Sequence, residues 1–117
     1  IESAEEALKN GVGGNLAGGT HHAFAGHGEG FCVFNDFAVV INYLQKNDLA
    51  KKIAIVDLDV HQGNGNASLL KDKKGVFILD MHGKNNYPIK KIPSTLDIER
   101  EDNIKDEEYL KMLSNNI

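Results

Sequence analysis

The apolar positions in the first half of the chain recur at helical spacing. Residues 3–10 are good helix formers and predict a short helix that stops at the glycine that follows. A second helix is predicted to run to about residue 46, with Asn35 or Asp36 as its cap. This helix is apolar nearly all round its first turns, so we expect it in the core. Residues 11–30 are rich in glycine but interleave histidines with phenylalanines, which favours an ordered loop over a flexible linker.

Four consecutive apolar residues at 53–56 predict a strand that is buried on both faces of a sheet. The remaining predicted elements are a short helix, two strands and a final amphipathic helix, at residues 66–71, 76–79, 94–98 and 106–113. We expect the third strand to lie at a sheet edge and the last helix to be capped by Asp106. Because helices alternate with strands, right-handed crossovers and a parallel sheet are expected, and the predicted fold class is α/β.

The composition is that of one modest globular domain. Of 117 residues, 41% are hydrophobic and 26% charged, and a net charge of −4 without a basic stripe argues against direct contact with nucleic acid. The single cysteine, Cys32, excludes an internal disulfide and fits a reducing compartment. With no transmembrane-length apolar run and no signal peptide, we expect a cytoplasmic protein without membrane contact. Because the chain begins at Ile1, we interpret it as an internal piece of a longer protein.

Chemistry is concentrated in the stretch IAIVDLDVHQGNG, residues 53–65. After the apolar run, Asp57, Asp59 and His61 occupy every second position, so their side chains share one side if the extended geometry persists. Strand ends of parallel α/β sheets are where ligands bind, and carboxylate with imidazole suits zinc or iron. Taken singly, Asp59 is better explained as a loop cap and His61 as a satisfied histidine at a strand end. Their shared register with Asp57 favours a metal site.

His21 and His22 are the candidates for proton transfer. In metal-assisted hydrolysis of an amide, a metal polarises the carbonyl, a base takes a proton from water and an acid protonates the departing amine. Adjacent histidines on a glycine-rich loop can both approach such a centre, because glycine lets the backbone come close. Each ring needs a partner on its far nitrogen, and Asp57 and Asn64 are available.

Three motifs in this order, GGTHHA, GEGFCVFND and DLDVHQGNG, resemble the histone deacetylase superfamily, which includes acetylpolyamine and acetoin-utilisation deacetylases. The resemblance runs from Ala4 to about Leu113, and the motif GGTHHAF is most similar to bacterial members and class IV histone deacetylases. It implies a three-layer arginase/deacetylase-like α/β fold, here in part, with residues 1–117 as the central segment of a single catalytic domain. It also implies zinc-dependent hydrolysis of N-acetyl or longer N-acyl amides on protein lysines or on small amines.

The resemblance further implies roles for single residues. Asp59 and His61 would be the zinc (or iron) ligands, and His21 and His22 the active-site histidines. Asp57 would orient His21, and Asn64 would orient His22. His22 would be the principal general base and acid. Gly30 and Phe31 would line a tunnel for the acyl-lysine chain. A structural K⁺ or Na⁺ would be held by Asp57 and Asp80, with backbone oxygens that include that of Met81.

Two departures from the family pattern shape the prediction. Asn64 stands where many members have aspartate, so it can orient His22 but adds no charge, and a weaker base is expected. The family's third zinc ligand and its carbonyl-polarising tyrosine belong to motifs that do not occur here. None of the tyrosines has the context of that residue, because Tyr43 and Tyr109 belong to predicted helices and Tyr87 to a proline-flanked connection. His27 and His82 are interpreted as structural or surface residues. The alternatives are therefore a small-amide amidohydrolase and a catalytically inactive metal-binding fragment.

Overall fold

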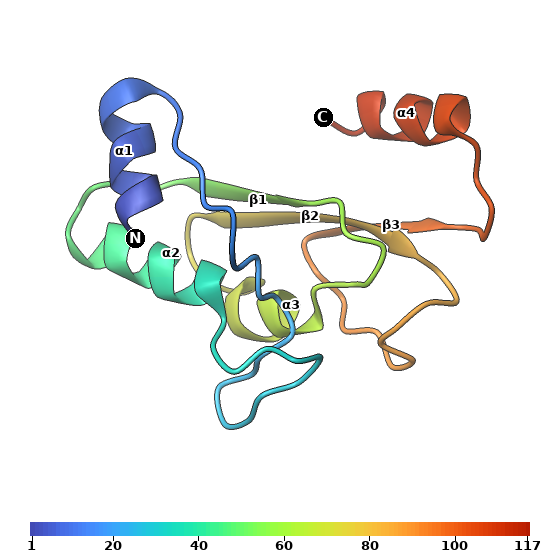
Figure 1. Cartoon of the computed structure of the whole chain (residues 1–117), viewed down its shortest axis with the longest axis horizontal. Coiled ribbons are helices and arrows are strands. Elements are labelled where there is room, and N and C mark those ends of the chain that lie inside the picture. Colours follow the sequence, from blue (N-terminus) through green and yellow to red (C-terminus); the bar gives the residue numbers. More distant parts are fainter.

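The computed structural model describes residues 1–117, which form a three-stranded sheet and four helices (Figure 1). The elements in chain order are α1 (Glu2–Asn10), α2 (Asp36–Lys46), β1 (Ile53–Asp57), α3 (Asn64–Leu70), β2 (Val76–Gly83), β3 (Leu96–Arg100) and α4 (Asp106–Ser114). The strand order is β1-β2-β3 and both pairings are parallel, so the predicted α/β class with a parallel sheet is confirmed. None of the helices has the length and apolarity needed to cross a membrane.

Neighbouring residues of β2 pack into two separate cores, one on each face of the sheet. Ile78 packs with Ile55 and with residues of α2 and α3. Leu79 belongs to the second core, which also holds Ile98 and is covered by α4. Figure 1 shows the sheet between α2 and α3 on one side and α4 on the other. This is the three-layer arrangement that the resemblance implied, and it follows from the two-residue period of a strand.

Helix ends follow the sequence signals in two cases and depart from them in a third. Gly11 ends α1 in the left-handed conformation, with φ of 86°. The Asn35 side chain caps α2 by accepting a hydrogen bond from the Ala38 N–H at 2.8 Å. The predicted cap of α4 is wrong, because Lys105 occupies the N-cap position and Asp106 is the first helical residue. The Asp106 carboxylate therefore lies in the first turn, where it favours the helix through the macrodipole rather than as a cap.

The strands differ from their predicted bounds and burial. The prediction that β1 is buried on both faces of the sheet is wrong, because Ile55 is buried while Ala54 and Val56 are exposed. The α4 helix covers the second face over β2 and β3 and leaves that side of β1 open. Strand β2 continues past its predicted end through Asp80 to Gly83, α3 begins two residues early, and β3 lies two residues further along. The edge position predicted for the third strand is confirmed, since β3 pairs with β2 alone.

Candidate active site

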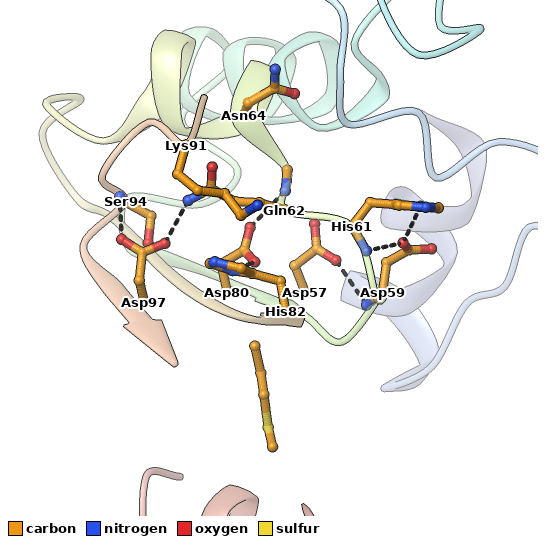
Figure 2. Close-up of polar contacts among 12 residues, drawn as sticks. Asp57, Asp59, His61, Gln62, Asn64, Asp80, His82, Lys91, Ser94 and Asp97 are labelled. Atoms are coloured by element: carbon orange, nitrogen blue, oxygen red, sulfur yellow. Dashed lines mark hydrogen bonds and ion pairs between the residues drawn. The ribbon is translucent and has the colours of Figure 1, made fainter. Parts of the chain in front are cut away.

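The segment after β1 is a chain of turns rather than a continued strand. Strand β1 ends at Asp57. The Asp59 N–H then donates to Asp57 Oδ1 at 3.2 Å, and the His61 N–H donates to Asp59 Oδ1 at 2.8 Å (Figure 2). Each carboxylate thus accepts from the amide two residues on, which is the habit of aspartate in turns. The extended geometry expected for these three residues is therefore wrong, and local turns set the positions of Asp59 and His61.

Asp59 and His61 form an accessible pair of metal-ligand type. The His61 Nδ1 lies 3.0 Å from Asp59 Oδ1, and 42% of the imidazole and 51% of the carboxylate remain exposed. His61 lines a cavity of about 440 Å³ together with four other residues, His22, Gly30, Phe31 and Tyr87. One carboxylate and one imidazole beside a cavity fit zinc or iron in donor chemistry. No third carboxylate, imidazole or thiol joins them, so the chain offers two of the three protein ligands usual in a catalytic zinc site.

His21 is buried against a carboxylate. Its Nδ1 lies 2.7 Å from Asp57 Oδ2, and less than a tenth of either side chain is exposed. Burial lowers the pKa of His21, but the hydrogen bond to Asp57 and the charges of Asp57, Asp59 and Asp80 outweigh burial. The pKa of His21 is therefore raised above its ordinary value. The hydrogen bond expected between these two residues is present.

His22 has the opposite electrostatic environment. Its Nδ1 lies 2.8 Å from Asn64 Oδ1, so the second expected hydrogen bond is present as well. Burial lowers the pKa of His22, the hydrogen bond to Asn64 offsets this only in part, and the neighbouring imidazoles of His21 and His61 lower it further. The rings of His21 and His22 lie 4.1 Å apart. Two adjacent imidazoles are thus tuned in opposite directions, which is the arrangement expected of a charged stabiliser beside a neutral base.

Two glycines let the backbone close around the histidine pair. A Cβ on Gly30 would lie 2.3 Å from Cδ2 of His22, and Gly30 has a φ of 53°. A Cβ on Gly65, in the first turn of α3, would lie 2.5 Å from the Ala23 carbonyl oxygen. Phe31, beside Gly30, is fully exposed at the rim of the cavity. The motif glycines are therefore needed for close approach.

Tyr87 and Glu29 belong to the site, although the sequence did not single them out. The Tyr87 ring packs edge-on against His22 and His61, with centroids 5.1 and 5.9 Å apart. The Tyr87 hydroxyl donates to Glu29 Oε1 at 2.9 Å, and Asn64 Nδ2 donates to the same oxygen at 2.7 Å. One signal was available for Tyr87. It follows β2 as His61 follows β1, and the carboxyl ends of adjacent parallel strands meet at one edge.

Buried carboxylates lie side by side beneath the turn. Asp57 and Asp80 are register partners, and the Gly63 N–H donates to Asp80 Oδ2 at 2.8 Å. Burial, reinforced by the charge of Asp57, raises the pKa of Asp80, although its hydrogen bond to His82 opposes this. Figure 2 shows His82 beside Asp80, with Nδ1 2.7 Å from Asp80 Oδ1. His82 is fully buried, so of the two predicted roles it has the structural one.

The proposed monovalent-cation ligands are close together, but their role stays a prediction. Asp57 and Asp80 concentrate negative charge that a cation would neutralise. The Met81 carbonyl, the third expected ligand, accepts a hydrogen bond from Arg100 Nη2 at 3.3 Å.

His27 is largely exposed and stacks on Phe24, as a surface residue would.

Known proteins resemble this chain in sequence and in fold. The model of the histone deacetylase domain matches residues 1–117. An uncharacterized protein of Picosynechococcus is 44% identical over 117 residues, which are 100% of this chain and 39% of that protein. Histone deacetylase 2 of Arabidopsis thaliana is 40% identical over 88 residues, 75% of this chain and 23% of the relative. The crystal structure of an HDAC homolog from Aquifex aeolicus matches with a TM-score of 0.83 at 32% identity, covering 96% of this chain and 33% of that one. The chain thus spans well under half the length of each.

Proposed function

Because this chain belongs to the histone deacetylase family, we propose that it is the central part of a zinc-dependent deacetylase domain that hydrolyses N-acetyl or longer N-acyl amides on lysine side chains. One observation carries the proposal. His21 and His22 each use Nδ1 for a buried hydrogen bond to a different partner, and His22 lines the same cavity as His61. An oriented imidazole beside a carboxylate–imidazole pair is what metal-assisted amide hydrolysis requires.

The residues of this chain would divide the work by their protonation states. Zinc, held by Asp59 and His61, would polarise the amide carbonyl and make water more acidic. His22 carries its proton on Nδ1, where Asn64 Oδ1 accepts it, so Nε2 is free to take a proton from water. As oxygen bonds to the carbonyl carbon and the C–N bond breaks, His22 returns that proton to the departing amine. His21, whose pKa is raised by its hydrogen bond to Asp57, would stabilise the developing negative charge in its protonated form.

The cavity wall suggests the kind of substrate. Gly30 and Phe31 would line a passage for the alkyl chain of the acylated amine, and Tyr87 adds a second aromatic side chain to the same cavity. Aromatic faces suit a straight methylene chain but do not distinguish a lysine from a polyamine. Acetylated lysine in a protein is the substrate we propose. An acetylated small amine is the competing substrate that the assay must separate from it.

A zinc titration combined with an acetate-release assay tests the proposal. The 117-residue chain and the product of its whole reading frame would be assayed with an acetyl-lysine peptide and with an acetylated polyamine. We expect Asp59→Ala and His61→Ala to weaken zinc binding by at least about tenfold. His22→Ala should keep zinc binding and lower turnover by at least about a hundredfold. Asp72→Ala, which removes an exposed carboxylate in the turn before β2, is the matched control.

The outcomes separate the alternatives. Faster turnover of the polyamine would favour a small-amide amidohydrolase. Zinc binding without turnover of either substrate, in the whole reading-frame product, would favour an inactive metal-binding protein and contradict the proposal.

A further inference from the structure

We propose that Glu29 is a positioning residue. Glu29 and Asn64 act as a pair that takes the place of a single carboxylate behind His22, and Glu29 also fixes Tyr87 against the cavity. The inference rests on the proposed function for its kinetic consequences. Its structural part is independent of turnover. Glu29 stands one residue before Gly30 in the motif GEGF, and its carboxylate accepts from the amide nitrogen of Asn64, whose oxygen faces His22.

The first arm of Glu29, its hydrogen bond with Asn64, completes the hydrogen bonding of that buried amide. Asn64 is 2% exposed, and its Oδ1 faces both His22 Nδ1, at 2.8 Å, and the Gly65 N–H, at 3.1 Å. That leaves the Asn64 amide hydrogens to be satisfied, and a buried donor without a partner is costly. Glu29 Oε1 accepts one of them at 2.7 Å. The amide therefore has one orientation, with its oxygen toward His22.

The second arm of Glu29, its hydrogen bond with Tyr87, reaches a residue of the cavity wall. The same Oε1 accepts from the Tyr87 hydroxyl at 2.9 Å, and the Tyr87 ring lies edge-on to His22. Glu29 Oε2 lies 3.6 Å from His27 Nε2, and a third of the Glu29 side chain is exposed. The two arms of Glu29 thus end on two neighbours of His22, the Asn64 amide that accepts from Nδ1 and the Tyr87 ring that packs edge-on.

The pair gives a specific chemical prediction about position 64. An aspartate there could accept from His22, but it has no hydrogen to donate to Glu29. Two carboxylates would then face each other at the 2.7 Å separation that Asn64 and Glu29 now occupy, which is strongly unfavourable. Asn64→Asp alone should therefore impair the site. A glutamine at position 29 would relieve the repulsion, because its amide can donate to the new aspartate.

A double-mutant cycle on the active reading-frame product tests this. We expect Glu29→Gln to lower kcat/KM modestly when residue 64 is asparagine. Asn64→Asp should lower it by about tenfold, and Asn64→Asp with Glu29→Gln should recover most of that loss. The effect of Glu29→Gln thus changes sign with the residue at position 64. Equal losses on adding Glu29→Gln in both backgrounds would overturn the pairing. Glu101→Gln, at an exposed ion pair with Lys84, is the control and should have no effect.

A split between KM and kcat separates the two arms. Tyr87→Phe keeps the aromatic ring and loses only the hydroxyl, so it should raise KM by a few-fold and leave kcat unchanged. Glu29→Ala should raise KM by the same factor and also lower kcat by about tenfold. In the Tyr87→Phe background Glu29→Ala should no longer change KM. A further rise in KM there would overturn the second arm.

An NMR measurement distinguishes failure of this inference from failure of the proposed function. A side-chain amide proton of Asn64 that donates to a carboxylate should be shifted downfield, and Glu29→Ala should remove that shift whether or not the protein turns over substrate. Unchanged Asn64 signals in Glu29→Ala would overturn the pairing even in an active enzyme. The expected shift in a protein without turnover would support the pairing and count against the deacetylase proposal.

Discussion

His21 and His22 are neighbours in the sequence, yet the two halves of the site that hold them differ in charge and in access to solvent. Asp57 holds His21 in a closed, ionic environment. A neutral amide holds His22, and the next group outward, Glu29, is partly exposed. The pKa values of the two imidazoles shift in opposite directions as a result. Two identical side chains acquire different chemistry because carboxylates surround His21, whereas an amide and two other imidazoles surround His22.

Removing the two partners should have the largest and most unequal effects on stability. Asp57→Ala leaves the His21 imidazole buried without its anion, which should lower the free energy of unfolding by about 4 kcal/mol. Asn64→Ala removes the hydrogen bonds to His22 and to the partly exposed Glu29 carboxylate but leaves no buried charge unpaired, so it should cost about 2 kcal/mol. Urea denaturation of the metal-free protein measures both. Equal losses would show that the ionic character of the His21 half is unimportant.

The pH dependence of that difference follows from the raised pKa of His21. Because the pKa of His21 is higher in the folded protein than the unfolded value of 6.5, protonation of His21 stabilises the fold. This stabilisation is complete at a pH below 6.5 and is lost as the pH rises through the folded-state pKa. The deficit of Asp57→Ala relative to the native protein should therefore shrink as the pH is raised above 6.5.

Gly30 tests how closely the His22 half is packed. Gly30→Ala meets a positive φ of 53° and a contact with His22, which together should cost about 3 kcal/mol. Gly26→Ala, in the same loop, has no atom within 4 Å of the new methyl group and should change stability by less than about 0.5 kcal/mol. Thermal unfolding of both variants provides the comparison. A Gly30→Ala protein as stable as Gly26→Ala would mean that the loop moves freely away from His22.

The sequence predicted the class of sheet from its own pattern and the histidine partners through the family resemblance. The parallel sheet followed from the alternation of helices and strands, and the pairing of His21 with Asp57 and of His22 with Asn64 was implied by the motifs shared with the histone deacetylase superfamily. The burial of Val56 was misjudged because an apolar run does not reveal which neighbours cover it. Asp106 was misplaced by a single position, a usual uncertainty at helix ends.

The contacts missed by the sequence analysis are those between distant loops. Tyr87 and Glu29 are 58 residues apart, and their hydrogen bond depends on how the loop after β2 folds back. The place of Tyr87 after β2 indicates the edge of the sheet where it lies but not Glu29 as its partner, and nothing in the spacing of Glu29 indicates Tyr87. Only the assembled structure shows that both converge on the surroundings of His22.

The most direct measurement is an NMR titration of the two imidazoles in metal-free protein, with each ring assigned by His21→Ala and His22→Ala variants. Our account predicts that His21 titrates above 6.5 and His22 below it, since Asp57 favours the protonated form of the first and burial favours the neutral form of the second. Titration of both rings together, or in the reverse order, would contradict the assignment of His22 as the neutral base.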